Sequence, residues 1–295
     1  MDIETLKGEQ ILELTHTLKV YDFETNDGEK EIGKDGSLKL KSRVYKYRRN
    51  IGNIFNDSRL YLEYNYALPS NLTWVVEATV SDKQFYGNIS DNELRRLGIT
   101  NKFNDPRLTS GALLLLDDKG GSHGFVVTEK AVYVFEERMA NYRTPDNYYH
   151  AYAYMIPVAE IASDKVLLNI TWIPDYGFEY YVDHIKVLEI PKEDLGIGLD
   201  KEFDKCMVID LGGKTELPIN PTIFKITFGT FMKPDILRPH WSFADKAIVQ
   251  LKPEYEYYYP YTKEKMKFIL KSGHAILGQG NEFTIHDLKI KAFTE

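Results

Sequence analysis

The residues best suited to chemistry in this sequence alternate along a stretch near the middle of the chain. Residues 148–156 read YYHAYAYMI, and their aromatic content predicts a β-strand. Side chains alternate across a strand, so one face carries Tyr148, His150, Tyr152 and Tyr154. The other face carries Tyr149, Ala151, Ala153 and Met155, which suit a core between two sheets. Tyrosine combines a flat apolar ring with a polar tip, so the first face is predicted to bind a ligand.

A second predicted strand, Ala131–Arg138, supplies the carboxylate that would complete this face. If its valines point to the core, Tyr133 and Glu137 project from the other side. Glu137 and His150 are then the best acid–base pair that the sequence offers, and Tyr133 becomes a further ligand-binding residue. The alternative is a structural ion pair between Glu137 and a nearby arginine, since such pairs also perturb pKa values.

Two other places supply ligand-binding candidates. Glu77 lies on the polar face of the predicted strand Thr73–Val80. The loop sequence RPHWSF places Arg238, His240 and Trp241 together, which is the composition of a ligand-contacting loop. Trp241 could equally be a hydrophobic plug that holds the loop down.

The sequence predicts neither a metal site nor a cofactor. Its seven histidines show no His-x-His or His-Glu-x-x-His spacing, which argues against zinc. Asp117 and Asp118 could supply oxygens to calcium, but a charged hairpin turn explains them equally well. The paired glycines are followed by no predicted helix, so they are not phosphate loops. Cys206 is the only cysteine, which excludes an intramolecular disulfide.

The elements that position these residues are short strands separated by frequent turns. The clearest are three in succession, Val166–Trp172, Phe178–Val182 and Ile185–Glu189. The sequence Pro174-Asp175-Tyr176-Gly177 joins the first two, and Asp183-His184 joins the second pair, which predicts an antiparallel meander. We therefore predict an all-β fold, an antiparallel two-sheet jelly-roll sandwich with one short helical insertion. A single domain spans 1–295, with its core at about 60–293 and an N-terminal extension at 1–59.

The helical insertion is predicted at residues 81–110. Ser90 to Glu93 fit a capping box and are followed by LRRLGI, which indicates one short helix. An insertion of this length is either a lid over the site or an ordered surface segment. In the second case the tyrosine-rich face would pack beneath it.

The composition of the chain argues against nucleic acid and membranes as partners. The 295 residues carry a formal net charge of −7, so the sequence has no electrostatic footprint for nucleic acid. Its one basic run, residues 39–49, is expected to be a solvated edge strand. No apolar run approaches the roughly 20 residues of a membrane span. No leader pattern is visible at the N-terminus, so a cytoplasmic location is expected.

The meander carries a resemblance to a known family. Ile170-Thr171-Trp172, Pro174-Asp175, Phe178 and Tyr180-Tyr181-Val182-Asp183 resemble the Trp-Pro turn and following hairpin of laminarinase- and lichenase-type glucanases, and Gly278-Gln279-Gly280 adds to the likeness. More broadly, the chain resembles concanavalin A-like lectin/glucanase jelly rolls, which include laminin G-like modules. The resemblance implies a sandwich with a ligand groove. His184 stands where that family has glycine.

The resemblance does not extend to catalysis. Those glucanases carry three alternating carboxylates on a strand before the hairpin, which places all three on one face. The corresponding strand here, AVYVFEER, offers Glu136 and Glu137, which are adjacent and point to opposite faces.

Three hypotheses about function follow. The first is binding of a carbohydrate or polyhydroxylated small ligand in the groove, with hydrolysis undecided. The second is a cytoplasmic cyclase- or isomerase-like enzyme that acts on a hydrophobic biosynthetic intermediate, which a closed apolar cavity under the 81–110 insertion would favour. The third is a structural or partner-binding sandwich with an exposed apolar patch. The oligomeric state stays open.

Overall fold

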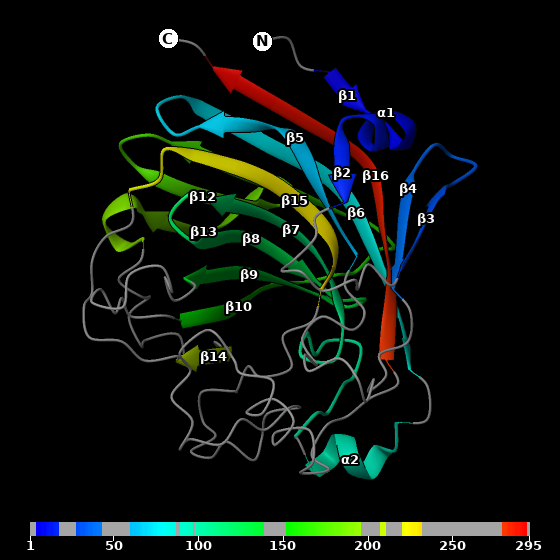
Figure 1. Cartoon of the computed structure of the whole chain (residues 1–295). Coiled ribbons are helices and arrows are strands. Elements are labelled where there is room, and N and C mark those ends of the chain that lie inside the picture. The colour runs from blue at the N-terminus through cyan, green and yellow to red at the C-terminus, as the bar shows by residue number, and fades with distance from the viewer. Residues whose placement is uncertain are drawn as a thin grey trace, which may run out of the picture.

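The strands of the protein form two antiparallel sheets that pack face to face around a shared core (Figure 1). The computed structural model describes residues 4–17, 28–42, 60–86, 89–96, 98–138, 152–195, 207–210, 220–231 and 279–293. Its architecture confirms the predicted all-β jelly-roll sandwich.

Sheet A contains the meander and the two longest strands. Its order is β13 (Ile185–Pro191), β12 (Gly177–Val182), β11 (Val166–Ile173), β6 (Thr73–Tyr86), β16 (Gln279–Phe293), β4 (Leu38–Ser42) and β3 (Gly28–Ile32), with β1 (Glu4–Leu6) also paired to β16.

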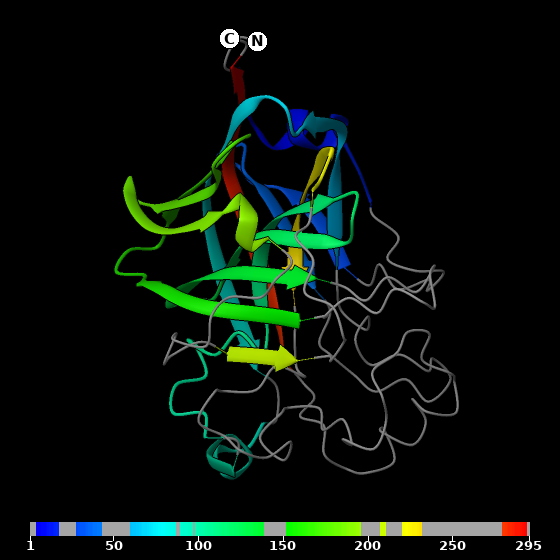
Figure 2. The same cartoon turned by 90° about the vertical axis from the view of Figure 1, so that its left-hand side faces the viewer.

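Sheet B faces it. Its order is β14 (Met207–Asp210), β10 (Tyr152–Glu160), β9 (Ala131–Arg138), β8 (Gly121–Val127), β7 (Ser110–Asp117), β15 (Ile223–Phe231), β5 (Tyr61–Pro69) and β2 (Thr15–Thr17). Figure 2 shows β9, β10 and β14 side by side in this sheet.

Helices are few and short. They are α1 (Gly8–Glu13), α2 (Asp91–Arg96) and the 3₁₀ helix η2 (Lys192–Asp194). The helix predicted in the insertion is confirmed by α2. Within the described ranges, no helix is long and apolar enough to cross a membrane.

The described part of the N-terminal segment 1–59 is built into both sheets instead of extending from them. It supplies β1, β3 and β4 to sheet A and β2 to sheet B. The predicted edge position of the basic run is wrong where the run is described, because β4, which holds Lys39 and Lys41, lies between β16 and β3.

The predicted meander is confirmed as β11, β12 and β13, each within about two residues of its expected bounds. Asp183 and His184 both have positive φ, 48° and 66°. A two-residue turn of this kind matches the twist of the strands that it joins, and Asp and His enter the left-handed region more readily than most residues. A glycine is therefore not required at position 184.

The meander is anchored by aromatic packing between the sheets. Trp74 of β6 and Trp172 of β11 are fully buried and stack with ring centroids 6.3 Å apart. Phe178 and Phe224 lie 4.8 and 4.9 Å from the Trp172 ring. Each indole N–H donates to a main-chain carbonyl, Trp74 to Pro69 and Trp172 to Ser70, so burial leaves neither donor unpaired.

The predicted face of β10 is wrong by one residue. Tyr154 lies opposite Glu136 and packs against the inter-sheet core. Ala153 and Met155 lie opposite Glu137 and Phe135, and they are fully buried on the outer side of sheet B. Because side chains alternate with a period of two, an error of one residue exchanges the two faces.

The contact between Gly111 and Phe283 tests the packing of the two sheets. A Cβ atom at Gly111 would lie 1.9 Å from the buried Phe283 ring of the opposite sheet. Gly111→Ala should therefore lower the free energy of unfolding by about 1–3 kcal/mol, as overpacking does. Urea denaturation of the wild type and the variant measures this loss of stability. Phe283→Leu should recover part of that loss in the double variant, whereas strictly additive costs would contradict the contact.

Candidate functional site

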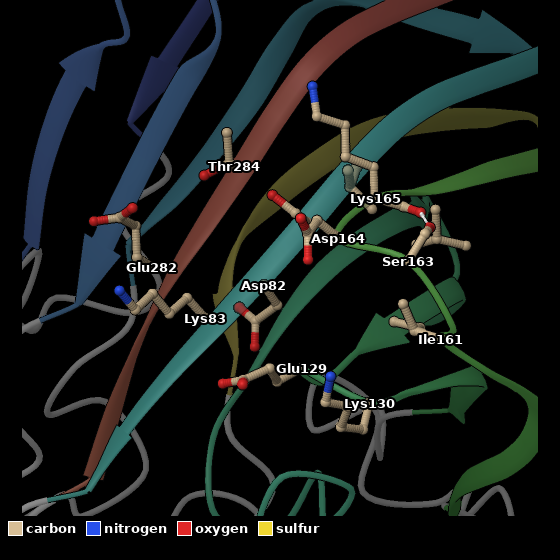
Figure 3. A pocket seen from close by; sticks show the side chains of 13 residues that line it. Asp82, Lys83, Glu129, Lys130, Ile161, Ser163, Asp164, Lys165, Glu282 and Thr284 are labelled. Atoms are coloured by element: carbon tan, nitrogen blue, oxygen red, sulfur yellow. Dashed lines mark hydrogen bonds between the residues drawn. The ribbon is translucent and has the colours of Figure 1, made fainter.

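A polar pocket opens beside the second half of β6, with a volume of about 310 Å³ (Figure 3). Four segments line it. They are β6, with Val80, Ser81, Asp82 and Lys83; β16, with Glu282 and Thr284; the β8–β9 turn, with Glu129 and Lys130; and the β10–β11 connection, with Ile161, Ser163, Asp164 and Lys165, which leads into Val166 of β11.

The pocket lies where β6 outruns one of its neighbours. β16 pairs with β6 as far as Tyr86, but β11 pairs with it only up to Val80. Beyond Val80, the edge of β6 that faced β11 is open. At Gln84 a side chain takes the place of the missing strand, because the main-chain N–H donates to a Glu129 carboxylate oxygen at 3.2 Å.

Charges in the pocket are layered by depth. Asp82 is only 8% exposed, and Glu129 and Glu282 are half-buried. The side chains of Lys83, Lys130, Asp164 and Lys165 are exposed. The pocket therefore has an acidic floor, formed by Asp82 and Glu129. Its rim carries Lys83, Lys130, Lys165, Asp164 and Glu282. Glu282 belongs to the rim because it lies opposite Lys83 and so points to the other face of sheet A from Asp82.

Asp82 is an acid with incomplete hydrogen bonding. Its Oδ1 accepts from Asn281 at 2.7 Å, while Oδ2 is buried without a hydrogen-bond partner in the structure. Burial, followed by the negative charges of Glu129 and Glu282, raises the pKa of Asp82 well above its usual value and outweighs the Asn281 bond.

The ionised groups of the pocket do not neutralise one another by contact. Among the described residues, the side chains of Lys83, Lys130, Asp164, Lys165 and Glu282 form no hydrogen bond or ion pair, and Glu129 accepts only the Gln84 N–H. Donors and acceptors around the pocket thus stay open to a bound molecule.

No described cluster of three or more His, Cys, Asp or Glu has the arrangement of a metal site. At the turn considered for calcium, Asp117 accepts from the Lys119 and Gly121 main chain, and Asp118 accepts from Thr222. These hydrogen bonds support the hairpin-turn interpretation.

A second buried polar group lies between the sheets. His123 of β8 is 1% exposed, and its two ring nitrogens lie 2.6 Å from Glu136 Oε2 and 3.1 Å from Asp117 Oδ2. Tyr180 of sheet A donates to the other Glu136 oxygen at 2.5 Å. Burial alone lowers the pKa of His123, but the two carboxylates outweigh it and raise this pKa to about 10. Burial raises the pKa of Asp117, yet its His123 contact outweighs this and holds that pKa below the usual value.

Sequence comparison assigns the chain to a family. The sequence profile described as "Family of unknown function (DUF6081)" matches residues 63–293. The chain belongs to this family. No curated protein matches its sequence.

Several solved structures resemble this DUF6081 chain at low identity. A Crh5 transglycosylase in complex with NAG is 11% identical, with 98% of this chain and 83% of that chain covered and a TM-score of 0.48. Beta-agarase B from Zobellia galactanivorans is 12% identical, with 99% and 91% covered and a TM-score of 0.48. A beta-1,3-glucanase from Mycobacterium marinum is 6% identical, with 87% and 74% covered and a TM-score of 0.40. With TM-scores under 0.5, these likenesses carry no argument about this chain.

The structure brings together few of the site residues predicted from the sequence of this DUF6081 member. Tyr148, His150, Arg238, His240 and Trp241 lie outside the described residues, and Tyr152 is described only by its main chain, which pairs with Arg138. Glu137 is half-buried on the outer side of sheet B, and Tyr154 points to the opposite side of that sheet. The acid–base role of Glu137 and His150 stays a prediction.

Glu77 and Tyr133 are each engaged elsewhere. Glu77 lies in sheet A, where it accepts from Lys289 at 2.8 Å, so it is separate from Glu137 of sheet B. Tyr133 is 5% exposed, and its hydroxyl donates to the Asn104 carbonyl. For Tyr133 the packing alternative therefore holds, with segment 98–110 lying over the ring.

Sequence reasoning missed the pocket and the His123 group. Asp82 and Gln84 continue the alternation of Trp74, Val76, Ala78 and Val80 on the inward face of β6, and this polar continuation was the available signal. The His123 group left no such signal, because its members come from three strands of sheet B and one of sheet A.

Replacing His123 tests the buried group. His123→Gln would leave two buried carboxylates without their cation and should cost about 3–5 kcal/mol, measured by urea denaturation. His123 has a raised pKa, so its contribution is full below pH 6.5 and is lost as the pH rises towards about 10. Asp117 has a lowered pKa, so its contribution is present above pH 3.8 and is lost on acidification below that value. The wild-type advantage over the variant should therefore be largest between these limits. A pH-independent difference would contradict a charged His123.

Tyr133→Phe tests the packing role of that hydroxyl. Loss of one hydrogen bond should cost about 0.5–1.5 kcal/mol in a thermal or urea melt. Ligand affinity should stay unchanged. A variant with wild-type stability and weakened ligand binding would instead restore Tyr133 to the binding site.

Proposed function

We propose that the protein binds a small polyhydroxylated ligand of the carbohydrate class in the pocket beside β6. The observation that supports this most is the set of charged side chains around the pocket, Lys83, Glu129, Lys130, Asp164, Lys165 and Glu282, which pair with no described residue apart from the single bond to Glu129.

A hydroxyl group fits such a lining because it both donates and accepts hydrogen bonds. One sugar-like molecule can donate to the carboxylates of the floor while it accepts from the lysines of the rim. The volume of about 310 Å³ is at the small end of ligand pockets, which run from roughly 300 to 1,000 Å³, and it suits one or two sugar rings.

The charged lining does not favour the alternative hypothesis of an enzyme that acts on a hydrophobic intermediate. That hypothesis expected an apolar cavity beneath the insertion, whereas carboxylates and lysines dominate this pocket. The proposal concerns binding. Hydrolysis, the cytoplasmic location and the ligand-binding roles of Tyr148, Tyr152, Arg238, His240 and Trp241 stay predictions.

A thermal-shift screen with mono- and oligosaccharides tests the proposal. A sugar that binds the folded state raises the apparent stability, by about 2.7 kcal/mol at 100 times its Kd. Glu129→Gln keeps an acceptor for the Gln84 N–H but removes the charge, and it should lose most of the shift. Glu193→Gln, an exposed site on η2, is the matched control and should keep it. The absence of any shift at millimolar sugar would count against the proposed function.

A further inference from the structure

We propose that the ligand of this pocket carries an amino group besides its hydroxyls, and that this group binds as an ammonium ion at the acidic floor. The inference rests on the proposed binding function and narrows its ligand to amino sugars and related amino polyols.

The depth of the charged residues in the pocket indicates that the ammonium group of the ligand points to the floor. Of the floor residues, Asp82 is buried and Glu129 is half-buried, so their interactions with a ligand are weakly screened. The lysines of the rim are exposed and therefore screened by solvent. Figure 3 shows the Asp82 carboxyl group on the side of β6 that faces Glu129, with the lysine side chains set around the pair.

The floor also lacks hydrogen-bond donors. Its two carboxyl groups have four oxygens, and the described residues donate hydrogen bonds to only two of them: Asn281 to Asp82 Oδ1, and the Gln84 N–H to Glu129 Oε2. An ammonium group carries three donors and a positive charge. It therefore supplies what the floor lacks, and a neutral hydroxyl supplies only part of it.

The raised pKa of Asp82 fits this assignment. Burial, followed by the negative charges of Glu129 and Glu282, raises this pKa well above its usual value, and no opposing cation among the described residues is in contact. The remaining charges that line the pocket are Lys83, Lys130, Asp164 and Lys165. An ammonium ion at the floor should lower the pKa of Asp82, so its binding should release protons wherever the free carboxyl group is protonated. Affinity for the ammonium should consequently fall as the pH is lowered.

A metal ion is a less suitable occupant. Among the described residues, no group of three His, Cys, Asp or Glu is arranged to hold one.

Two achiral probes test the inference without any assumption about the sugar. Tris(hydroxymethyl)aminomethane carries hydroxymethyl groups and one ammonium, and pentaerythritol has a further hydroxymethyl group in place of the amine. In an amine-free buffer at constant ionic strength, calorimetry or thermal shift should show at least tenfold tighter binding of the amine. Unbuffered titration at neutral pH should show proton release. Glucosamine, glucose and N-acetylglucosamine repeat the comparison on a ring.

Asp82→Asn is the decisive variant. It keeps the shape of the protonated acid and the oxygen that accepts from Asn281, so the fold should be retained, and circular dichroism checks this. Its preference for the amine and its proton release should both disappear. Glu193→Gln should behave as the wild type.

Each other outcome overturns the inference in a recognisable way. Equal or tighter binding of pentaerythritol and glucose refutes the amino group but leaves the proposed function standing. Stabilisation by calcium chloride at lower concentration than by the amine would make the floor a metal site. If neither amine nor aminosugar binds, the inference falls, and the sugar screen decides separately whether the binding proposal survives.

Discussion

The structure depends on the unequal lengths of β6 and its neighbour β11. β6 has fourteen residues and pairs with β16 to its end, but β11 covers it only from Trp74 to Val80. In the covered half, the inward side chains are apolar and meet the aromatic cluster around Trp172. In the uncovered half, the same face carries Asp82 and Gln84. The inward face of the strand thus changes from apolar to polar where its neighbour ends.

This change sets a hydrogen-bonding problem, because buried polar groups are costly unless they find partners. The Gln84 amide donates to the Thr109 carbonyl, and the Thr109 hydroxyl donates to Asn281. Asn281 in turn donates to Asp82. The 98–110 segment therefore helps to close the end of the core, which explains why it packs firmly whether or not it also covers a site. The last member of this network is Asp82, whose Oδ2 has no hydrogen-bond partner among the described residues and which lines the pocket.

The sequence was informative wherever structure is local. The meander, its two turns and the α2 helix follow from turn chemistry and alternation, and they occur close to their predicted bounds. Local pattern could not show which face of β10 points to the core. A tyrosine such as Tyr154 suits a core as well as a groove, and a small residue such as Ala153 suits either face of the sheet. Glu136 was recognised as pointing away from Glu137, but its partners His123 and Tyr180 are supplied by strand pairing and sheet packing, which no local pattern shows. The sequence also could not show where β11 stops pairing with β6, because this depends on the register between two segments that are far apart in the chain.

The protein treats its two sets of buried carboxyl groups in opposite ways. Asp117 and Glu136 enclose a cation supplied by the chain itself, His123, and Tyr180 completes the hydrogen bonding. Asp82 has no such cation in contact among the described residues, and burial together with the charges of Glu129 and Glu282 raises its pKa well above its usual value. A buried ion group that is internally paired is closed to ligands, because any newcomer must displace a partner that is already well placed. Asp82, in contrast, has no internal cation to displace, and its Oδ2 has no hydrogen-bond partner in the described part of the structure. This difference in internal pairing, more than depth or volume, separates the structural cluster between the sheets from the pocket at the end of β6.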